Sequence, residues 1–215
     1  PAAEPTPTPT ATPAAEPTPA RVAAATYSFL TESLSTKLTN GFSTKSKKFG
    51  TSVAIHGDTI ISGDPNDFSE GSDSGSASVF NISNDTWIQQ AEITADDVYQ
   101  GYLFGEAVDI DGDTAVVGAT GGAKGAVYVF VLSNSIWNQQ AKLVDIATDS
   151  SAKFGGSVAI NGDTIVIGAP TDDAPQTDSG SAFVFTRTGD VWSKATQLSA
   201  SGRNYTLNNN RFGES

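Results

Sequence analysis

One sequence unit occurs three times in this chain and determines most of its architecture. Each copy contains Phe-Gly, a short apolar run, Gly-Asp-Thr, a second apolar run that ends in Gly, and a later Trp. The copies begin at Phe49, Phe104 and Phe154, and a fourth Phe-Gly pair starts at Phe212. These starts lie 55, 50 and 58 residues apart. Periods of about 40 to 50 residues built from four short strands are typical of propeller blades, whereas helical arrays repeat at shorter periods.

Each copy is predicted to form a four-stranded antiparallel meander. In the first copy we expect strands over residues 52–55, 58–63, 76–83 and 86–94. The first corner reads His-Gly, Asp-Gly or Asn-Gly in successive copies, which indicates a two-residue type I′ hairpin turn. The Asp that follows is expected to fix this corner through its carboxylate. The fold class is therefore all-β, with three complete propeller blades and partial blades at both ends.

The partial blades leave two explanations open. Residues 29–40 resemble an orphan fourth strand, because Leu38 precedes Phe49 by the same spacing as Leu143 precedes Phe154. Closed propellers usually need about four blades or more, so three do not complete a ring. The favoured explanation is truncation from a longer propeller. The alternative is head-to-tail self-association through the open ends, which would generate a fibre.

The third copy resembles a known repeat. Residues 154–170 read Phe-Gly-Gly-Ser-Val-Ala-Ile-Asn-Gly-Asp-Thr-Ile-Val-Ile-Gly-Ala-Pro, which is similar to the FG-GAP repeat of integrin-type β-propellers. The resemblance covers roughly residues 30–215, and Gly-Ala-Pro is intact only in this copy. It implies a β-propeller of the variant that is common in bacterial and environmental surface proteins.

Integrin-type blades often carry a calcium loop between the first and second strands. A two-residue corner cannot supply the roughly six to eight oxygen ligands that calcium takes, so this site is not transferred to the present chain. The nearest remnant is the run Asp109, Asp111 and Asp113, whose carboxylates recur at every second position. These three residues remain the candidate Ca²⁺ site.

Composition excludes several classes of function. The chain has 12 Lys and Arg against 24 Asp and Glu, a net charge of −12, which disfavours a nucleic-acid groove because phosphate binding needs clustered cations. Its longest apolar stretch, the seven residues 126–132, is far too short for a membrane span. The absence of Cys excludes disulfides, thiolate metal sites and cysteine catalysis. The expected location is extracellular or at the cell surface, after secretion.

The N-terminal segment has a different composition from the repeats. Residues 1–25 are rich in Pro, Thr and Ala and predict an extended stalk or linker, whereas residues 26–215 hold the blades. Alternating Thr and Pro resembles mucin-like stalks with O-linked sugars, although a linker without sugars is an equal alternative. The glycosylation candidates are Thr6, Thr8, Thr10, Thr12 and Thr18 on the stalk and the Asn-x-Ser/Thr sequons at Asn81, Asn84 and Asn204.

Ligand contact is predicted at one end of the blades. All variation in repeat length falls in the loops between strands two and three and between consecutive blades, and recognition usually lies in such variable loops. These loops are acidic, which suggests a cation-dependent or basic partner; a solvated charged rim is the alternative. The candidate ligand-facing residues are Asp64, Asp67, Glu70, Asp73, Asp172, Asp173 and Asp178.

Aromatic residues at fixed positions are predicted to pack between blades. Trp87, Trp137 and Trp192 could instead form a sugar-stacking platform, but their constant place in the repeat favours packing. The Phe residues of the Phe-Gly pairs are read as wedges between blades, with Gly allowing close backbone approach. The single histidine, His56, lies at a turn, and any Ser-His-Asp triad would depend on it.

Two function classes follow from the sequence. The favoured one is a non-catalytic extracellular glycoprotein module for cell adhesion or structural assembly, whose partners are other proteins, surface glycans or further copies in a filament. The alternative is a propeller enzyme that acts on extracellular polysaccharide through paired loop carboxylates, although no spacing singles out a pair.

Overall fold

The computed structural model describes residues 37–39, 41, 48–68, 70–97, 99–122, 124–145, 152–173, 179–199 and 211–215. All of them belong to one compact unit. The predicted stalk over residues 1–25 lies outside the described residues, so its boundary stays a prediction. The same holds for the candidate sites Thr6, Thr8, Thr10, Thr12, Thr18, Asp178 and Asn204.

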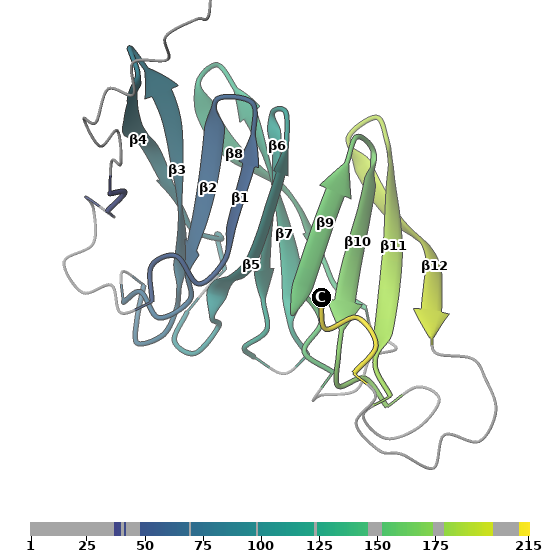
Figure 1. Cartoon of the computed structure of the whole chain (residues 1–215). Helices are drawn as coiled ribbons and strands as arrows, with labels where there is room; N and C mark the ends of the chain where they lie inside the picture. Colours follow the sequence, from purple (N-terminus) through teal and green to yellow (C-terminus); the bar gives the residue numbers. More distant parts are fainter. Residues whose placement is uncertain are drawn as a thin grey trace, which may run out of the picture. The chain divides into compact units, whose positions relative to one another are not determined.

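Three antiparallel sheets of four strands each make up the described part of the chain (Figure 1). The first sheet contains β1 (Val53–His56), β2 (Thr59–Asp64), β3 (Ser76–Ser83) and β4 (Thr86–Ile93). The second contains β5 (Phe104–Asp111), β6 (Thr114–Ala119), β7 (Ala126–Ser133) and β8 (Ile136–Leu143). The third contains β9 (Ser157–Asn161), β10 (Thr164–Ala169), β11 (Ser181–Thr188) and β12 (Val191–Ser199). Each sheet pairs its strands in chain order, which confirms the predicted propeller blades.

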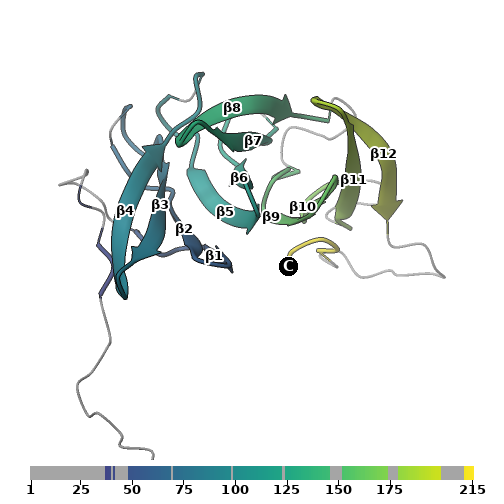
Figure 2. The same ribbon diagram turned by 90° about the horizontal axis from the view of Figure 1, so that it is seen from above.

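Burial along the strands follows their position in the blade. The second strand β6 reads Thr-Ala-Val-Val-Gly-Ala and is buried at every residue. A continuous apolar run of this length is the pattern of a strand that is covered on both faces. The outermost strand β4 instead alternates between exposed and partly buried residues, as expected where one face meets solvent. Figure 2 shows β1, β5 and β9 as the innermost strands and β4, β8 and β12 as the outermost.

The first corner of each blade differs from the prediction by one residue. His56 pairs with Thr59, so the turn residues are Gly57 and Asp58. Only Gly57 has a positive φ, of 55°, which fits a type II′ turn and not type I′. The backbone carbonyl of Asp58 holds the corner by accepting the N–H of Ile82 at 3.1 Å, whereas the prediction assigned this role to the carboxylate. Equivalent bonds occur in the other two blades.

The Phe-Gly pair of each blade docks on the blade before it. Phe104 donates its backbone N–H to the carbonyl oxygen of Ser74 at 3.0 Å and forms a parallel bridge with Gly75. The carbonyl oxygen of Gly105 lies so close to Gly63 that a Cβ atom there would approach it to 1.9 Å. The equivalent close pairs are Gly118 with Gly155 and Gly168 with Gly213. The Phe-Gly and Gly-Ala-Pro parts of the repeat are thus the two sides of one contact between blades.

The phenylalanine of each internal pair fills the space between neighbouring sheets. Phe104 is fully buried in a cluster that includes Ile61 and Val79 from the first blade. Phe154 is fully buried in a second cluster with Val129 from the second blade. The predicted role of these rings as wedges between blades is therefore confirmed.

Short segments beside the complete blades follow the same repeat. The backbone N–H of Phe212 donates to the carbonyl oxygen of Ser179 at 3.1 Å, so the last Phe-Gly pair docks on the third blade. Before the first blade, the N–H of Gly41 donates to Oε1 of Gln89 at 2.8 Å. Of the predicted orphan strand over residues 29–40, only 37–39 are described, and they are not in a strand.

Candidate functional site

Three of the predicted ligand-facing acids are buried. Asp64, Asp67 and Asp172 have exposed fractions of 1%, 0% and 2%. Asp67 and Asp172 occupy equivalent places after β2 and β10, and their backbone carbonyls accept the N–H groups of Gly75 at 3.2 Å and Gly180 at 2.9 Å. Buried carboxylates are not accessible from solvent, so this burial favours neither ligand contact nor the alternative of a solvated rim at these three positions. Ligand contact there stays a prediction.

The other described loop acids lie on different blades. Asp73 is half-buried and accepts hydrogen bonds from Nδ2 of Asn66 at 2.5 Å and from Oγ of Ser72 at 3.4 Å. Glu70 is exposed on the loop after β2, and Asp173 is exposed on the loop after β10. Among the described residues, the exposed acids of this set are thus distributed over the first and third blades.

The carboxylates on β5 connect the inner strands of the blades. Oδ2 of Asp109 accepts the backbone N–H of Ile160 at 2.7 Å, and Oδ2 of Asp111 accepts that of Gly162 at 2.6 Å. Both donors belong to the third blade. These carboxylates satisfy N–H groups on the edge of β9, which would otherwise lack an acceptor.

The three acids of the candidate calcium site have different surroundings. Oδ1 of Asp111 lies 3.0 Å from Nδ1 of His56 on the first blade, so this carboxylate is engaged by both neighbouring blades. Asp113 is an exposed turn residue. In the part of the chain that the structure describes, no group of three or more His, Asp or Glu residues could hold a metal ion. The arrangement does not favour metal binding at Asp109, Asp111 and Asp113, which stays a prediction.

The tryptophans of the second and third blades face the preceding blade. Nε1 of Trp137 donates to Oε1 of Gln90 at 3.1 Å, and Nε1 of Trp192 donates to Oε1 of Gln140 at 2.9 Å. Both side chains are 9% exposed. Packing between blades is confirmed for these two residues, and they do not form a sugar platform. Trp87, on the first blade, is only partly buried.

A cluster of phenols and charges lies where the first blade connects to the second. Lys142 Nζ is 2.6 Å from Oδ2 of Asp97, and the Tyr128 hydroxyl donates to Oδ1 of Asp97 at 2.9 Å. The hydrogen bond from Lys142 holds the pKa of Asp97 below its usual range. Burial raises the pKa of Tyr128 to about 12, and a hydrogen bond with Tyr99 raises that of Tyr102 to about 12. Sequence reasoning missed this cluster, although the next junction has an analogous ion pair between Lys194 of the third blade and Asp145 of the connector before it.

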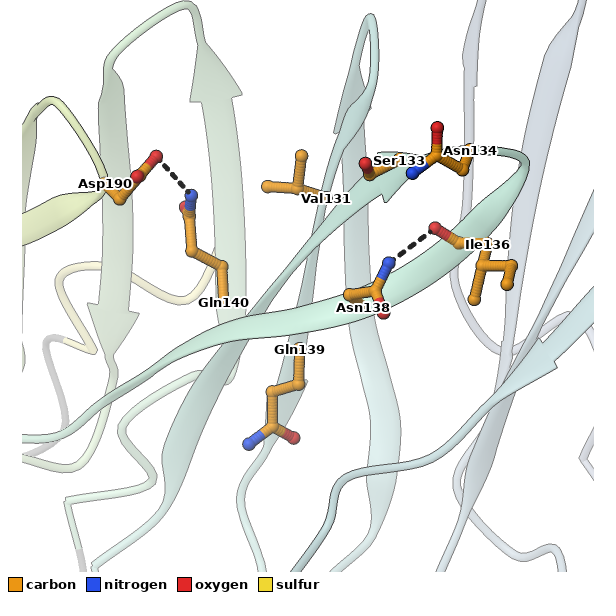
Figure 3. A pocket seen from close by; sticks show the side chains of 8 residues that line it. All are labelled: Val131, Ser133, Asn134, Ile136, Asn138, Gln139, Gln140 and Asp190. Atoms are coloured by element: carbon orange, nitrogen blue, oxygen red, sulfur yellow. Dashed lines mark hydrogen bonds between the residues drawn. The ribbon is translucent and has the colours of Figure 1, made fainter.

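An open hollow of about 570 Å³ lies where the outer strands of the second blade meet the third (Figure 3). We call it the amide hollow; its lining residues are Val131, Ser133, Asn134, Ile136, Asn138, Gln139, Gln140 and Asp190. Nε2 of Gln140 donates to Oδ1 of Asp190 at 3.4 Å across the two blades. Sequence reasoning missed this site, since its residues are ordinary polar residues on a hairpin and a turn.

The two described sequons differ in accessibility. Asn81 lies on β3, is partly buried and donates from Nδ2 to Oγ1 of Thr59 at 3.0 Å. Asn84 is exposed in the turn between β3 and β4, with φ at 48°. Because Asn81 is partly buried and its Nδ2 lies against Thr59, its surroundings leave less room for a glycan than those of Asn84.

A protein-family model matches the chain three times, and each match begins before a blade and ends in the third strand of that blade. The model described as FG-GAP repeat matches residues 34–80, 87–130 and 137–185, which together exceed half of the chain. The chain belongs to the FG-GAP repeat family. Membership confirms the resemblance seen in the sequence, and the contact between Phe-Gly and Gly-Ala-Pro explains why both parts define an FG-GAP repeat.

Sequence similarity of the FG-GAP chain to other known proteins is weak. No curated protein matches it. One similar solved chain comes from the structure of S. cerevisiae dbp5 bound to nup159, gle1, ip6 and adp, with 11% sequence identity and a TM-score of 0.33. The similarity covers 66% of the FG-GAP chain and 45% of that chain, so it spans less than half of the latter. Within the described residues, no helix has the length and apolar character needed to cross a bilayer.

Proposed function

We propose that this chain is a non-catalytic structural or adhesive module that works outside the cell or at its surface. FG-GAP repeats are typical of extracellular and cell-surface β-propellers, which supports this location. The observation that carries the proposal is that several carboxylates of this chain accept hydrogen bonds from other residues of the blades. The carboxylate of Asp67 accepts the backbone N–H of Phe68 at 2.7 Å, and that of Asp172 accepts Nε2 of Gln197 at 3.4 Å. The carboxylates of Asp109 and Asp111 accept backbone N–H groups of the third blade, so all four are used within the fold.

The Pro/Thr-rich segment supports a surface role. A run of alternating Thr and Pro favours an extended spacer, which would hold the blades away from the surface that carries them. O-linked sugars on Thr6 to Thr18, and an N-linked sugar at Asn84, would make the protein a glycoprotein and stiffen the stalk further. Intact mass measurement of protein from its native source tests this part of the proposal.

Assembly into a filament is a second form of the structural role. Gly50 of the first Phe-Gly pair has φ at 86°, as its equivalents do, but a Cβ atom there would meet nothing within 4 Å. Among the described residues, nothing therefore docks against the glycine of this first Phe-Gly pair. On the third blade, however, Phe212 and Gly213 already fill the equivalent docking place. A head-to-tail fibre would have to displace them or use another contact, and electron microscopy of native material would distinguish polymers from discrete particles.

Two measurements, adsorption and the release of reducing ends, distinguish an adhesive module from an enzyme. The full chain is incubated with cell-wall polysaccharides and with protein-coated surfaces, and both adsorption and the release of reducing ends are followed. We expect adsorption without new reducing ends. Release of reducing ends that is abolished by Glu70→Gln or Asp173→Asn, but not by Asp113→Asn, would replace the proposal by a propeller enzyme.

A further inference from the structure

We propose that the amide hollow binds a neutral polysaccharide chain. The inference rests on the proposed adhesive role and names the class of ligand and the site. It concerns the junction between β7 and β8 of the second blade and the β11–β12 turn of the third blade (Figure 3).

The lining chemistry matches hydroxyl groups. Four of the eight lining residues carry side-chain amides, and Ser133 adds a hydroxyl. Oε1 of Gln139 accepts the backbone N–H of Asp96 at 3.2 Å and its side chain points away from the other lining groups (Figure 3), so Asn134, Asn138 and Gln140 are the amides proposed to meet a ligand. Sugar hydroxyls are both donors and acceptors, so such groups can pair with them in either direction. The lining contains no Lys, Arg or His and one carboxylate, Asp190. An anionic ligand would therefore meet a negative charge without a compensating cation.

Apolar surface is present beside these polar groups. Ile136 is 63% exposed, and Val131 also lines the hollow. The C–H face of a pyranose ring could cover this surface while its hydroxyls reach the amides. The volume of about 570 Å³ lies within the range of roughly 300 to 1,000 Å³ that is common for ligand sites. Because the hollow is open, a long chain can pass through it without a free end.

Part of the hollow is held in place by the contact between blades. Oε1 of Gln140 accepts the Nε1–H of the buried Trp192 at 2.9 Å, and Nε2 of Gln140 points toward Asp190 (Figure 3). The amide of Gln140 is thereby fixed before any ligand arrives. Nδ2 of Asn138 donates to the carbonyl oxygen of Ile136 at 2.9 Å, which orients a second amide. Groups held in advance lose less conformational entropy on binding.

The equivalent place between the first and second blades has different residues. Strand pairing puts Ile88 where the second blade has Asn138, and Ser135 where the third blade has Asp190. The first junction therefore lacks both the amide and the carboxylate. This difference provides a matched control within the same chain.

The test uses the full chain and soluble oligosaccharides. Cellohexaose, xylohexaose and mannohexaose serve as neutral probes, and oligogalacturonate serves as the anionic one. We expect a neutral probe to shift the NMR signals of the Asn138 and Gln140 side-chain amides. The double variant Asn138→Ala/Asp190→Ala should bind that probe about tenfold more weakly, as the loss of one or two hydrogen bonds implies. The control Ile88→Ala should bind it as the unaltered chain does.

Several outcomes would overturn the proposal. They are the absence of shifts in the hollow with every neutral probe, equal binding by the double variant, and a preference for oligogalacturonate or for an extended peptide. The NMR map of the unaltered chain decides the matter even if a variant fails to fold. If no probe shifts the NMR signals of the hollow while the chain still adsorbs to surfaces, the proposed glycan site is wrong and the adhesive role is kept. Release of reducing ends would instead remove the adhesive role.

Discussion

The carbonyl oxygen of Gly155 lies against Gly118, so closely that a Cβ atom at Gly118 would come within 2.0 Å of it. Backbone faces backbone here, so neither side can yield by a rotamer change. We expect Gly118→Ala to lower the free energy of unfolding by about 3 kcal/mol, the upper part of the usual range for overpacking. Guanidinium titration of the full chain measures this change.

A glycine outside the contact between blades supplies the control. At Gly41 the nearest atom to an added Cβ would be Oε1 of Gln89 at 3.4 Å, an ordinary contact distance. Gly41→Ala should therefore change the stability by no more than about 0.5 kcal/mol. Equal stability of the two alanine variants would mean that the second and third blades do not need this close approach.

Asp109 gives a second prediction about the joint between these blades. Its Oδ2 accepts the N–H of Ile160, a residue that is 8% exposed. Asp109→Ala should cost about 1 to 3 kcal/mol of stability, because the buried N–H loses its acceptor. Asp109→Asn keeps an oxygen and should lose less, and Asp113→Ala, in an exposed turn, should be nearly neutral. Thermal and denaturant unfolding of the three variants would reveal any other order.

Calcium is expected to have no effect on the stability of the blades. The carboxylates of Asp109 and Asp111 are occupied by backbone N–H groups and by His56, and no group of acids in the described part of the chain could hold a metal. The melting temperature should therefore be the same in excess calcium and in EDTA. A rise with calcium that Asp109→Asn abolishes would restore the metal site to β5.

The repeat made the blades and their aromatic contacts predictable, because those features recur at fixed spacing. The partners of Phe104 and Trp137 hold the same positions in the repeat as the partners of Phe154 and Trp192. Each set of partners belongs to the preceding blade. The acids were not predictable in the same way. A carboxylate such as Asp67 is usually exposed, and only the folded loop shows that it is fully buried.

The amide hollow could not be found from the sequence for a different reason. It depends on how a hairpin of the second blade meets a turn of the third, some 50 residues later. Gln140 and Asp190 are common surface residue types, and nothing in their local sequence indicates that they meet. The repeat predicts that the blades pack against one another. The shape of the surface at each junction depends on residues that vary between copies, such as Asn138 and its equivalent Ile88.

Two tyrosines are expected to titrate late in alkali. The pKa of Tyr128 is raised to about 12 by burial, and that of Tyr102 to about 12 by its hydrogen bond with Tyr99. Both values lie above the ordinary value of 10.0, so the folded state binds these protons more tightly than the unfolded state. Stability should therefore be fully present below about pH 10 and fall as the pH rises toward 12.

Tyrosinate absorbance separates the two causes. Tyr99→Phe removes the hydroxyl partner and should lower the pKa of Tyr102, while the titration of Tyr128 should stay late because its burial is unchanged. Tyr128→Phe should remove one late step and part of the loss of stability in alkali. If all tyrosines titrate together near 10 in the folded chain, the arrangement of this cluster is wrong.

The sequons at Asn81 and Asn84 lead to opposite expectations in protein from the native source. Asn84 is exposed at a hairpin turn, whereas Nδ2 of Asn81, the atom that a glycan would occupy, donates to Thr59. Thr86→Ala destroys the sequon of Asn84, and Ser83→Ala destroys the sequon of Asn81. If the chain carries an N-linked glycan on this hairpin, intact mass should fall by one glycan in Thr86→Ala and stay unchanged apart from the substitution in Ser83→Ala. The reverse result would show that the partly buried Asn81 is the modified residue.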